Sequence, residues 1–229
     1  MTVAQRIKLS ETTLSILKNF SGINSNILIK PGNILKTLSP MKNIMAEASI
    51  EESFDREIAI WDLNQFLGTI SLFSDPEFEF EEKYVNIYGS NGASVRYHYS
   101  APNLVTNVTK SLDMPEVVVN FDLEQRQLQE IQRAASVLGL PDLSVVSNGD
   151  QMELLASDKK VASSNSFSID LGALPSSDDF CFNFRVDNLK LIGGDYEVSI
   201  AKSVISRFIH KSIDVTYFIA LESDSTYNG

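Results

Sequence analysis

The 229-residue chain has a mass of 25.4 kDa, and 43% of its residues are hydrophobic, which is enough for the core of one large domain or two small ones. Its formal net charge of -11, from 30 acidic and 19 basic residues, argues against binding to nucleic acid or to an anionic membrane surface if the charges are evenly spread. A single cysteine, Cys181, excludes an intramolecular disulfide and a cysteine-based zinc site, and we expect it to be a buried strand residue in a reducing compartment.

Alternating apolar and polar residues predict that most of the chain is antiparallel β-sheet. The expected strands cover residues 26–30, 44–51, 57–61, 77–88, 93–100, 143–147, 151–157, 165–171, 180–186, 196–201 and 215–221. Glycine-containing turn signals predict hairpins between several of them. These signals are Pro31-Gly32, Ser90-Asn91-Gly92, Asn148-Gly149-Asp150 and Gly193-Gly194.

Helical spacing of apolar residues is confined to four segments, each preceded by a side chain that can cap a helix. The segments are 11–23 after Ser10, 63–73 after Asp62, 124–138 after Asp122, and the short segment 188–192 after Asp187. The first and third start about 113 residues apart, and the second and fourth about 125, a near-constant offset that is typical of a duplicated domain. The sequence therefore predicts an α+β fold built twice, each copy with two helices backed by antiparallel sheet.

The expected domain boundaries follow from this duplication. We predict an N-terminal domain at 1–105, a connector at 106–119 and a C-terminal domain at 120–229. The connector and the residues just before it are unusually apolar, with Leu104, Val105, Val108, Leu112 and Met114. Such a segment either packs along the sheet or also helps to form a docking groove, and the sequence leaves both possibilities open.

Acidic residues are scarce in the predicted helices outside their caps and first turns. There Lys18, Arg126, Arg133 and Lys190 outnumber the one acid, Glu130. If the four helices share one face of the molecule, that face is mildly basic while strands and loops are acidic. The cations are also explained by solvated helix faces or by the helix dipole, so the pattern alone does not decide between these interpretations.

No group of residues predicts an active site, a metal site or a cofactor. His98 and His210 have no nearby cysteine or histidine to complete a metal site, and we expect both to be ordinary strand residues. Neither a nucleophile elbow nor a phosphate-binding P-loop occurs. Glu77, Glu79 and Glu81 alternate on one strand face opposite two phenylalanines, which favours a solvated strand over a carboxylate site.

Three segments carry a resemblance to a known family. They read TTLSILKNFSGINSNILIK at 12–30, FDREIAIWDLNQFLGTISLF at 54–73 and YFIALESDST at 217–226. They resemble the DNA polymerase sliding clamp of T-even-type bacteriophages, and the similarity keeps this order along nearly the whole chain. The similarity is weaker from about residue 75 to 120 and in much of the second half, and a few extra residues precede Lys8.

This resemblance implies the DNA clamp (processivity) fold, in which three two-domain chains form a homotrimeric ring of six domains around duplex DNA. Helices would line the hole and sheets the outside, so that the charge distribution matters more than the net charge. The chain would not be an enzyme; it would tether the replicative polymerase during DNA replication and act as a mobile activator of phage late transcription. The DNA-facing residues would be Lys8, Lys18, Arg126, Arg133 and Lys190.

The resemblance also implies two kinds of protein contact. An apolar groove between the two domains would take a partner peptide, lined by Leu38, Ile44, Leu112, Met114, Val117, Ala220 and Leu221. Ile44 and Leu221 have an equally good interpretation as core residues. Ring closure would use exposed edge strands, with Ser94, Arg96 and His98 in one subunit and Ser166, Ser168 and Asp170 in the next.

The expected partners are double-stranded DNA, the C-terminal peptide of the replicative polymerase, an ATP-dependent clamp loader and late-transcription factors, in the cytoplasm of the infected bacterium. No apolar run approaches a membrane span, and no secretory signal opens the sequence. Two other classes stay in view. A non-catalytic acidic scaffold that does not bind DNA explains the charge but not the three segments, and a small-molecule enzyme requires a polar pocket built from distant loops.

Overall fold

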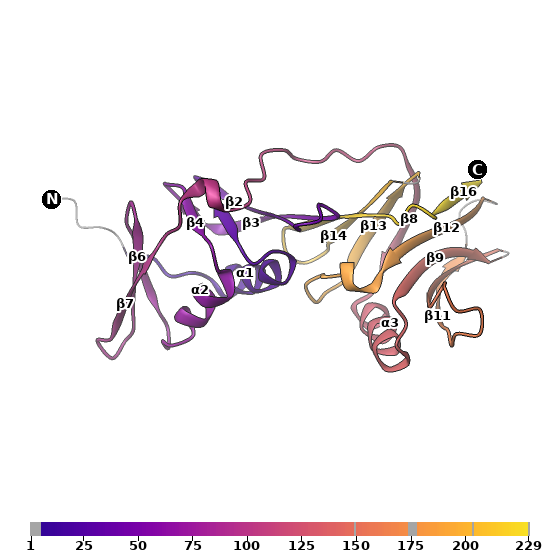
Figure 1. Ribbon diagram of the computed structural model, residues 1–229, viewed down its shortest axis with the longest axis horizontal. Coiled ribbons are helices and arrows are strands. Elements are labelled where there is room, and N and C mark those ends of the chain that lie inside the picture. Colours follow the sequence, from indigo (N-terminus) through magenta and orange to yellow (C-terminus); the bar gives the residue numbers. More distant parts are fainter. Residues whose placement is uncertain (1–5, 149, 174–177, 203, 229) are drawn as a thin grey trace. The chain divides into compact units, whose positions relative to one another are not determined.

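The computed structural model describes residues 6–148, 150–173, 178–202 and 204–228, and the chain divides into two units, Met1–Lys110 and Ser111–Gly229 (Figure 1). The first unit contains α1 (Glu11–Ile23), β1 (Ile27–Ile29), β2 (Gly32–Leu38), β3 (Ile44–Phe54), β4 (Ile58–Ile60), α2 (Leu63–Ile70), β5 (Glu77–Phe80), β6 (Tyr84–Tyr88), β7 (Ser94–His98) and the 3-10 turn η1 (Pro102–Leu104). All of its strand pairs are antiparallel: β1 with β4, β2 with β3, and the sheet β5-β6-β7.

Helix α1 begins and ends where the sequence predicts. The Ser10 hydroxyl accepts a hydrogen bond from the backbone N–H of Thr13, which caps the helix, and Asn24 returns to extended backbone at its end. Ile16, Leu17 and Phe20 form the buried stripe. This stripe packs α1 against β3 and α2 (Figure 1), so the opposite side of the helix is left to solvent.

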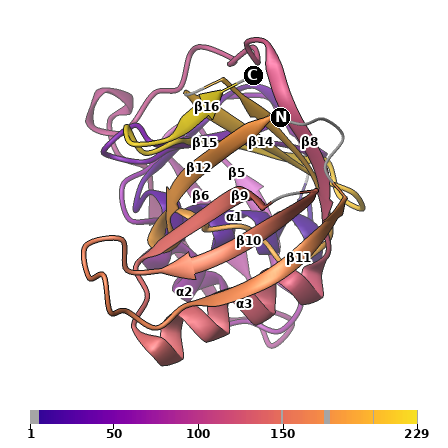
Figure 2. The same cartoon turned by 90° about the vertical axis from the view of Figure 1, so that its right-hand side faces the viewer.

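The second unit contains β8 (Val117–Leu123), α3 (Gln125–Leu138), β9 (Asp142–Asn148), β10 (Gln151–Ser157), β11 (Phe167–Ala173), β12 (Asp179–Arg185), the 3-10 turn η2 (Val186–Asn188), β13 (Tyr196–Ala201), β14 (Ile205–His210), β15 (Val215–Ala220) and β16 (Thr226–Asn228). Its strands form a sheet in the order β11-β10-β9-β12-β16 and an antiparallel run β15-β14-β13-β8. Helix α3 lies along β10 and β11 on one face of the first of these sheets (Figure 2).

The cap of α3 differs from the prediction. Glu124, not Asp122, is the N-cap, and it forms a reciprocal capping box with Gln127. Asp122 lies in β8 instead and pairs with Lys211. The helix ends at Gly139, whose φ of 67° suits a residue without a side chain.

The predicted fourth helix, 188–192, is absent from the described residues, which contain three α-helices. The 3-10 turn η2 ends at Asn188, and hydrogen bonds from side chains hold the backbone that follows it. The hydroxyl of Tyr196 donates to the carbonyl of Ile192, the N–H of Ile192 donates to the Tyr217 hydroxyl, and Gln132 donates to the carbonyl of Leu189. These tertiary hydrogen bonds replace the helical ones that a five-residue segment forms only weakly.

Several strand and turn predictions also need correction. Residues 77–88 are two strands of a hairpin, β5 and β6, not one strand, and α2 ends at Ile70. Pro31-Gly32 joins β1 to β2, which are not ladder partners, and Gly193-Gly194 leads from η2 into β13. The pairs β6–β7 and β9–β10 confirm hairpin connections at 90–92 and between residues 148 and 151, although Gly149 of the second turn lies outside the described residues.

The segment that leaves the first unit begins as a packed element. Val105 is buried with Leu28 and Ala59, and the N–H of Thr106 donates to the side-chain oxygen of Asn26 at 2.7 Å. Farther along, Leu112 is 40% exposed. Apolar residues are therefore buried just before the predicted connector, at Val105, and at its end in β8, at Val119, while Leu112 between them is exposed.

Candidate nucleic-acid interface and docking surfaces

Three of the cations predicted to face DNA lie on solvent-exposed sides of α-helices. Lys18 lies on α1 away from the buried stripe. Arg126 and Arg133 are seven residues apart and share one side of α3, away from the buried Leu128 and Ile131. Within the part of the chain that the structure describes, none of the three cations takes part in an ion pair. Their charges are therefore available to an external anion.

The other exposed residues of these helices are mostly neutral and polar, but Glu130 is also exposed and lies between Arg126 and Arg133 on the same side of α3. The neutral residues include Thr12 and Ser15 on α1, Asn64 and Gln65 on α2, and Gln129 on α3. Hydroxyl and amide groups can exchange hydrogen bonds with phosphate or water without adding charge. The prediction from the sequence considered only charged side chains and missed this feature, although the helical spacing of these residues was readable.

The remaining two predicted cations lie outside the α-helices. Lys8 pairs with the carboxylate of Asp75, and this hydrogen bond raises the pKa of Lys8 above its ordinary value. Lys190 is exposed and follows the 3-10 turn η2. Lys8 thus contributes to a locally neutral pair, so a phosphate gains less from it than from the three helical cations.

A depression of about 540 Å³ lies beside the start of α3, and Arg126 is part of its wall. The N–H of Gln125 donates to Asp195 Oδ1 at 2.7 Å, and Lys211 Nζ lies 2.8 Å from Asp122 Oδ1. Carboxylates therefore already occupy the positive end of the helix, where a phosphate would otherwise bind. Arg126 is the group in this wall that can extend toward an external anion.

The residues predicted to form subunit contacts lie on two edge strands. β7 is an edge of the sheet β5-β6-β7, and it exposes the side chains of Ser94, Arg96 and His98 on one face. β11 is an edge of the sheet of the second unit and exposes Ser168 and Asp170, while Ser166 immediately precedes it. An edge strand offers unpaired backbone groups to another chain.

The backbone of β7 shows which of its groups point outward. The N–H of Tyr99 donates to the carbonyl of Lys83, so every second residue of this strand turns its backbone toward β6. The alternate residues, Ser94, Arg96 and His98, turn theirs away from it. The guanidinium of Arg96 lies 4.3 Å from the ring centre of Tyr84, so its side chain is held on the exposed face.

The residues predicted to line the partner groove differ in exposure. Leu38 and Ile44 close the β2–β3 hairpin, and Ile44 is only 3% exposed. Leu112 is exposed, and four others are half-buried: Met114, Val117, Ala220 and Leu221. The most exposed of the predicted groove residues is therefore Leu112, in the segment before β8.

The two histidines are strand residues, as predicted. The ring of His98 lies beside that of Tyr84 on the exposed face of β7, with 5.6 Å between the ring centres and a tilt of 58°. His210 is buried in β14, where its Nδ1 accepts from the N–H groups of residues 212 and 213. Its Nε2–H is therefore the donor to the carbonyl of Gly193, at 3.0 Å. His210 is fully occupied in holding two loops together.

The acidic strand and the cysteine show no sign of chemistry. Glu79 accepts hydrogen bonds from the Tyr88 hydroxyl and the Asn86 amide, which lower its pKa, while Phe78 on the other face is buried. Cys181 is a strand residue of β12, as predicted, but it is half-buried and not buried as expected; this partial burial raises the pKa of its thiol. The described residues contain no cluster of three or more histidines, cysteines or acids that could hold a metal ion.

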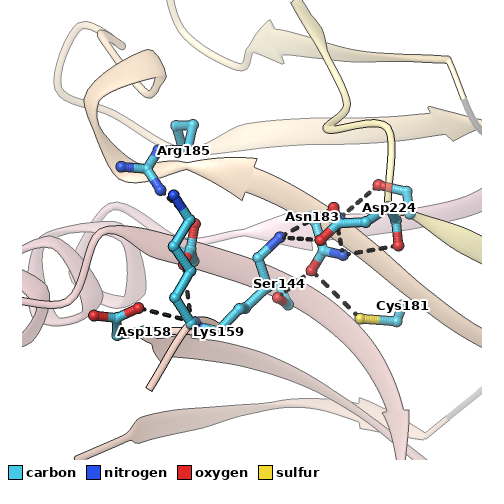
Figure 3. A network of polar contacts seen from close by, with 10 residues as sticks. Ser144, Asp158, Lys159, Cys181, Asn183, Arg185 and Asp224 are labelled. Carbon is cyan, nitrogen blue, oxygen red and sulfur yellow. Dashed lines mark hydrogen bonds and ion pairs between the residues drawn. The ribbon is translucent and has the colours of Figure 1, made fainter. Parts of the chain in front are cut away.

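A buried polar cluster in the second unit was not predicted (Figure 3). Asn183 is its centre: Ser144 donates to its side-chain oxygen at 2.6 Å, and its amide donates to the carbonyl of Asp224 at 3.2 Å. Lys159 Nζ lies 2.8 Å from the Asp224 carboxylate and holds its pKa below the usual range. The cluster ties the segment before β16 to the sheet. Its members are too far apart in sequence for any local pattern to indicate it.

None of the helices in the described ranges has the length and the apolar composition that a membrane crossing requires.

Comparisons with known proteins bear on this arrangement. Two family models match successive parts of the chain: DNA polymerase processivity factor over residues 8–101, and gp45 sliding clamp, C terminal, over residues 120–223. The sliding clamp of Vibrio phage KVP40 is 33% identical to it over 222 residues, which are 95% of this chain and 100% of the phage protein. The chain belongs to the sliding clamp family.

Solved structures agree on the fold. This clamp is similar to a chain of the PCNA2-PCNA3 complex from Sulfolobus tokodaii, with a TM-score of 0.66, 11% identity and coverage of 96% of this chain and 100% of the other. It is also similar to the Helicobacter pylori beta clamp bound to DNA ligase peptide, with a TM-score of 0.69, 11% identity and coverage of 97% and 67%. Such low identities concern the fold alone.

These matches confirm the family, the clamp fold and the function predicted from the three segments. The chain is a phage-type sliding clamp, a processivity factor that works with DNA and DNA polymerase in replication and assembles as a ring. The alternative of an acidic scaffold unrelated to DNA is not favoured.

Proposed function

We propose that three copies of this sliding clamp close a ring around duplex DNA, with Lys18, Arg126 and Arg133 turned toward the phosphates. The observation that carries this proposal is the position of these cations. In a chain with a net charge of -11, they lie on exposed helix sides, and no carboxylate of the described residues pairs with them. Most other exposed residues of these helices are neutral amides and hydroxyls, and Glu130 between Arg126 and Arg133 partly offsets their charge, so contacts with the DNA backbone would be weak and independent of sequence.

Weak contact suits a ring of this kind. Topology prevents escape, so the protein needs no tight grip, and a small screened attraction lets it slide. A polymerase bound to the ring stays at high effective concentration near the primer end instead of rebinding from solution. The proposed role is therefore non-catalytic.

The test is charge reversal on the helices. The variant Lys18→Glu/Arg126→Glu/Arg133→Glu should remain folded, because all three side chains are exposed, and should leave nicked circular DNA roughly tenfold faster or more once loaded. A control carries the same charge change on exposed lysines outside the helices, Lys42, Lys83 and Lys110. It should stay within about twofold of the parent, because these sites are not proposed to meet phosphates. Equal retention for both variants would reject the assignment.

We further propose that ring closure pairs the β7 edge of one subunit with the β11 edge of the next. Ser94, Arg96 and His98 would supply one side and Ser166, Ser168 and Asp170 the other. The support is that both strands are sheet edges and that Arg96 and Asp170 have opposite charge. Sedimentation equilibrium tests closure: three chains of 25.4 kDa give about 76 kDa, whereas a constant 25.4 kDa would leave no ring.

For the polymerase, we propose docking of a short apolar C-terminal peptide on the seven predicted groove residues. One supporting observation is that a clamp of similar fold, the Helicobacter pylori beta clamp, was solved bound to DNA ligase peptide. Leu112→Glu/Met114→Glu should abolish peptide binding measured by calorimetry, because each change puts a charge on a partly exposed apolar side chain. Val161→Glu, at another exposed apolar side chain, is the control. Unchanged affinity in the double variant would remove the segment before β8 from the site.

Family membership alone supports the remaining proposals: an ATP-dependent clamp loader and late-transcription factors as partners, and the cytoplasm of the infected bacterium as the place of action.

A further inference from the structure

A short segment ahead of α1 lies along the outer edge of β5. Ile7 and Phe78 exchange both backbone hydrogen bonds, at 2.9 and 2.8 Å. On either side of this bridge, Arg6 pairs with Glu77 at 3.3 Å and Lys8 pairs with a carboxylate beyond the strand. The Arg6 guanidinium also lies 3.8 Å from the ring centre of Tyr88 on β6. Three residues thus attach to the sheet through backbone, charge and ring contacts.

This attachment changes which edges of the sheet are open. In the order β5-β6-β7, β5 and β7 are the two edges. In the β5–β6 pairing, the N–H and the carbonyl of Phe78 point away from β6. Both groups form hydrogen bonds with the backbone of Ile7. The outward groups of β7 have no such cover in the described residues.

The second unit contains a fuller version of the same arrangement. There β8 precedes α3 and pairs with β13 along most of its seven residues. In the first unit the described residues before α1, which begin at residue 6, make one bridge, to the strand that follows α2. Arg6 and Ile7 also lie outside the residues that the processivity-factor model matches, which begin at residue 8. Among the described residues, the cover on β5 is therefore shorter than the corresponding cover of β13 by β8.

An uncovered β5 would compete for β7 of another copy. Its exposed face carries Glu77 and Glu79, opposite in charge to Arg96 on β7. The proposed ring contact opposes the same Arg96 to Asp170 on β11, so both edges present carboxylates to one cation. A β5–β7 contact joins different surfaces of the two copies. A series of such contacts has no built-in symmetry that closes it into a ring, so it would add further copies without limit.

We propose that the segment Arg6–Lys8 is an edge cap that keeps β5 from pairing with a second copy of the chain and so leaves β7 as the docking edge of the first unit. This inference rests on the proposed ring, in which β7 meets β11. The cap acts by occupying the Phe78 backbone groups and by neutralising Glu77.

The variant Arg6→Glu/Ile7→Pro tests the cap. Glutamate repels Glu77, and proline has no N–H for the Phe78 carbonyl, so the segment should detach. The control Arg6→Lys/Ile7→Val keeps both the charge and the bridge. Sedimentation velocity over a concentration series should show the parent and the control converging on about 76 kDa, and the variant adding larger species that grow with concentration.

The outcomes separate the cap from the ring. If the variant sediments like the parent, the cap does not limit self-association and the inference is wrong. If the parent stays at 25.4 kDa, the ring fails, yet larger species in the variant alone would still support the cap. If the variant loses its cooperative unfolding transition, the milder pair decides: Arg6→Glu should form large species, and Arg6→Glu/Glu77→Arg, which restores an ion pair, should not.

Discussion

Asn183 is the hydrogen-bonding centre of the second unit, and its replacement by leucine should be costly. The side chain is 3% exposed, accepts from Ser144 at 2.6 Å and donates to the carbonyl of Asp224 at 3.2 Å. Leucine has the same number of side-chain heavy atoms with the same branching, so the loss is chiefly polar. Two hydrogen bonds at about 0.5–1.5 kcal/mol each, with the buried Ser144 hydroxyl left unsatisfied at about 1–3 kcal/mol, give a loss of roughly 2–6 kcal/mol.

Urea unfolding followed by circular dichroism measures this loss. The chain concentration must be fixed, because association stabilises the folded subunit. The transition midpoint of Asn183→Leu should fall with little change in slope. Hydrogen exchange should also quicken at residues 222–225, where the N–H of Glu222 donates to the carbonyl of Asn183.

A second substitution separates the polar effect from packing. Ser144→Ala/Asn183→Leu removes the stranded hydroxyl and should recover about 1 kcal/mol or more relative to Asn183→Leu alone. A loss below about 0.5 kcal/mol for Asn183→Leu, together with unchanged exchange, would refute the reasoning that the cluster stabilises this unit.

Two further substitutions test local features of each unit. Partial burial raises the pKa of Glu52, but hydrogen bonds from Thr13 and Ser10 outweigh it, so the net pKa lies below its ordinary value of 4.5. The ionised carboxylate therefore contributes its full stabilisation above that pH, and the contribution is lost as the pH falls through the lowered pKa of the folded state. Glu52→Gln should lower the free energy of unfolding at pH 7 and make it fall less steeply as the pH is lowered, measured by urea unfolding at each pH. An equally steep fall in the variant would show that Glu52 does not contribute to the acid sensitivity. Gly194→Ala should cost roughly 2–4 kcal/mol by thermal or urea unfolding, through backbone strain and loss of the His210 hydrogen bond. Gly194 has a φ of 152°, and a Cβ there would lie 1.9 Å from His210 Nε2. The control is Gly193→Ala, whose Cβ would meet nothing within 4 Å, so its free energy of unfolding should be nearly unchanged. Equal losses of stability in the two variants would contradict the clash with His210.

Local patterns predicted much of the fold. The stripe and the Ser10 cap of α1 lie within 13 residues of one another, so spacing alone locates the helix. Four strands were missed, namely β2, β8, β14 and β16. β14 alternates buried and half-buried residues clearly, and the pattern was overlooked, whereas β16 is only three residues long and depends on its ladder with β12.

Amino-acid order by itself determined the duplicated α+β architecture, the family and the exposed cations of α1 and α3, because periodicity and capping act within a few turns of chain. Tertiary structure alone decided that residues 188–192 are not an α-helix, that Asn183 gathers Ser144 and Asp224, and that Ile7 covers β5. In each of these cases the deciding hydrogen bond joins groups at least 25 residues apart, or depends on a side chain brought in by another strand. Such partners become neighbours only once the sheets form, so no local spacing reveals them.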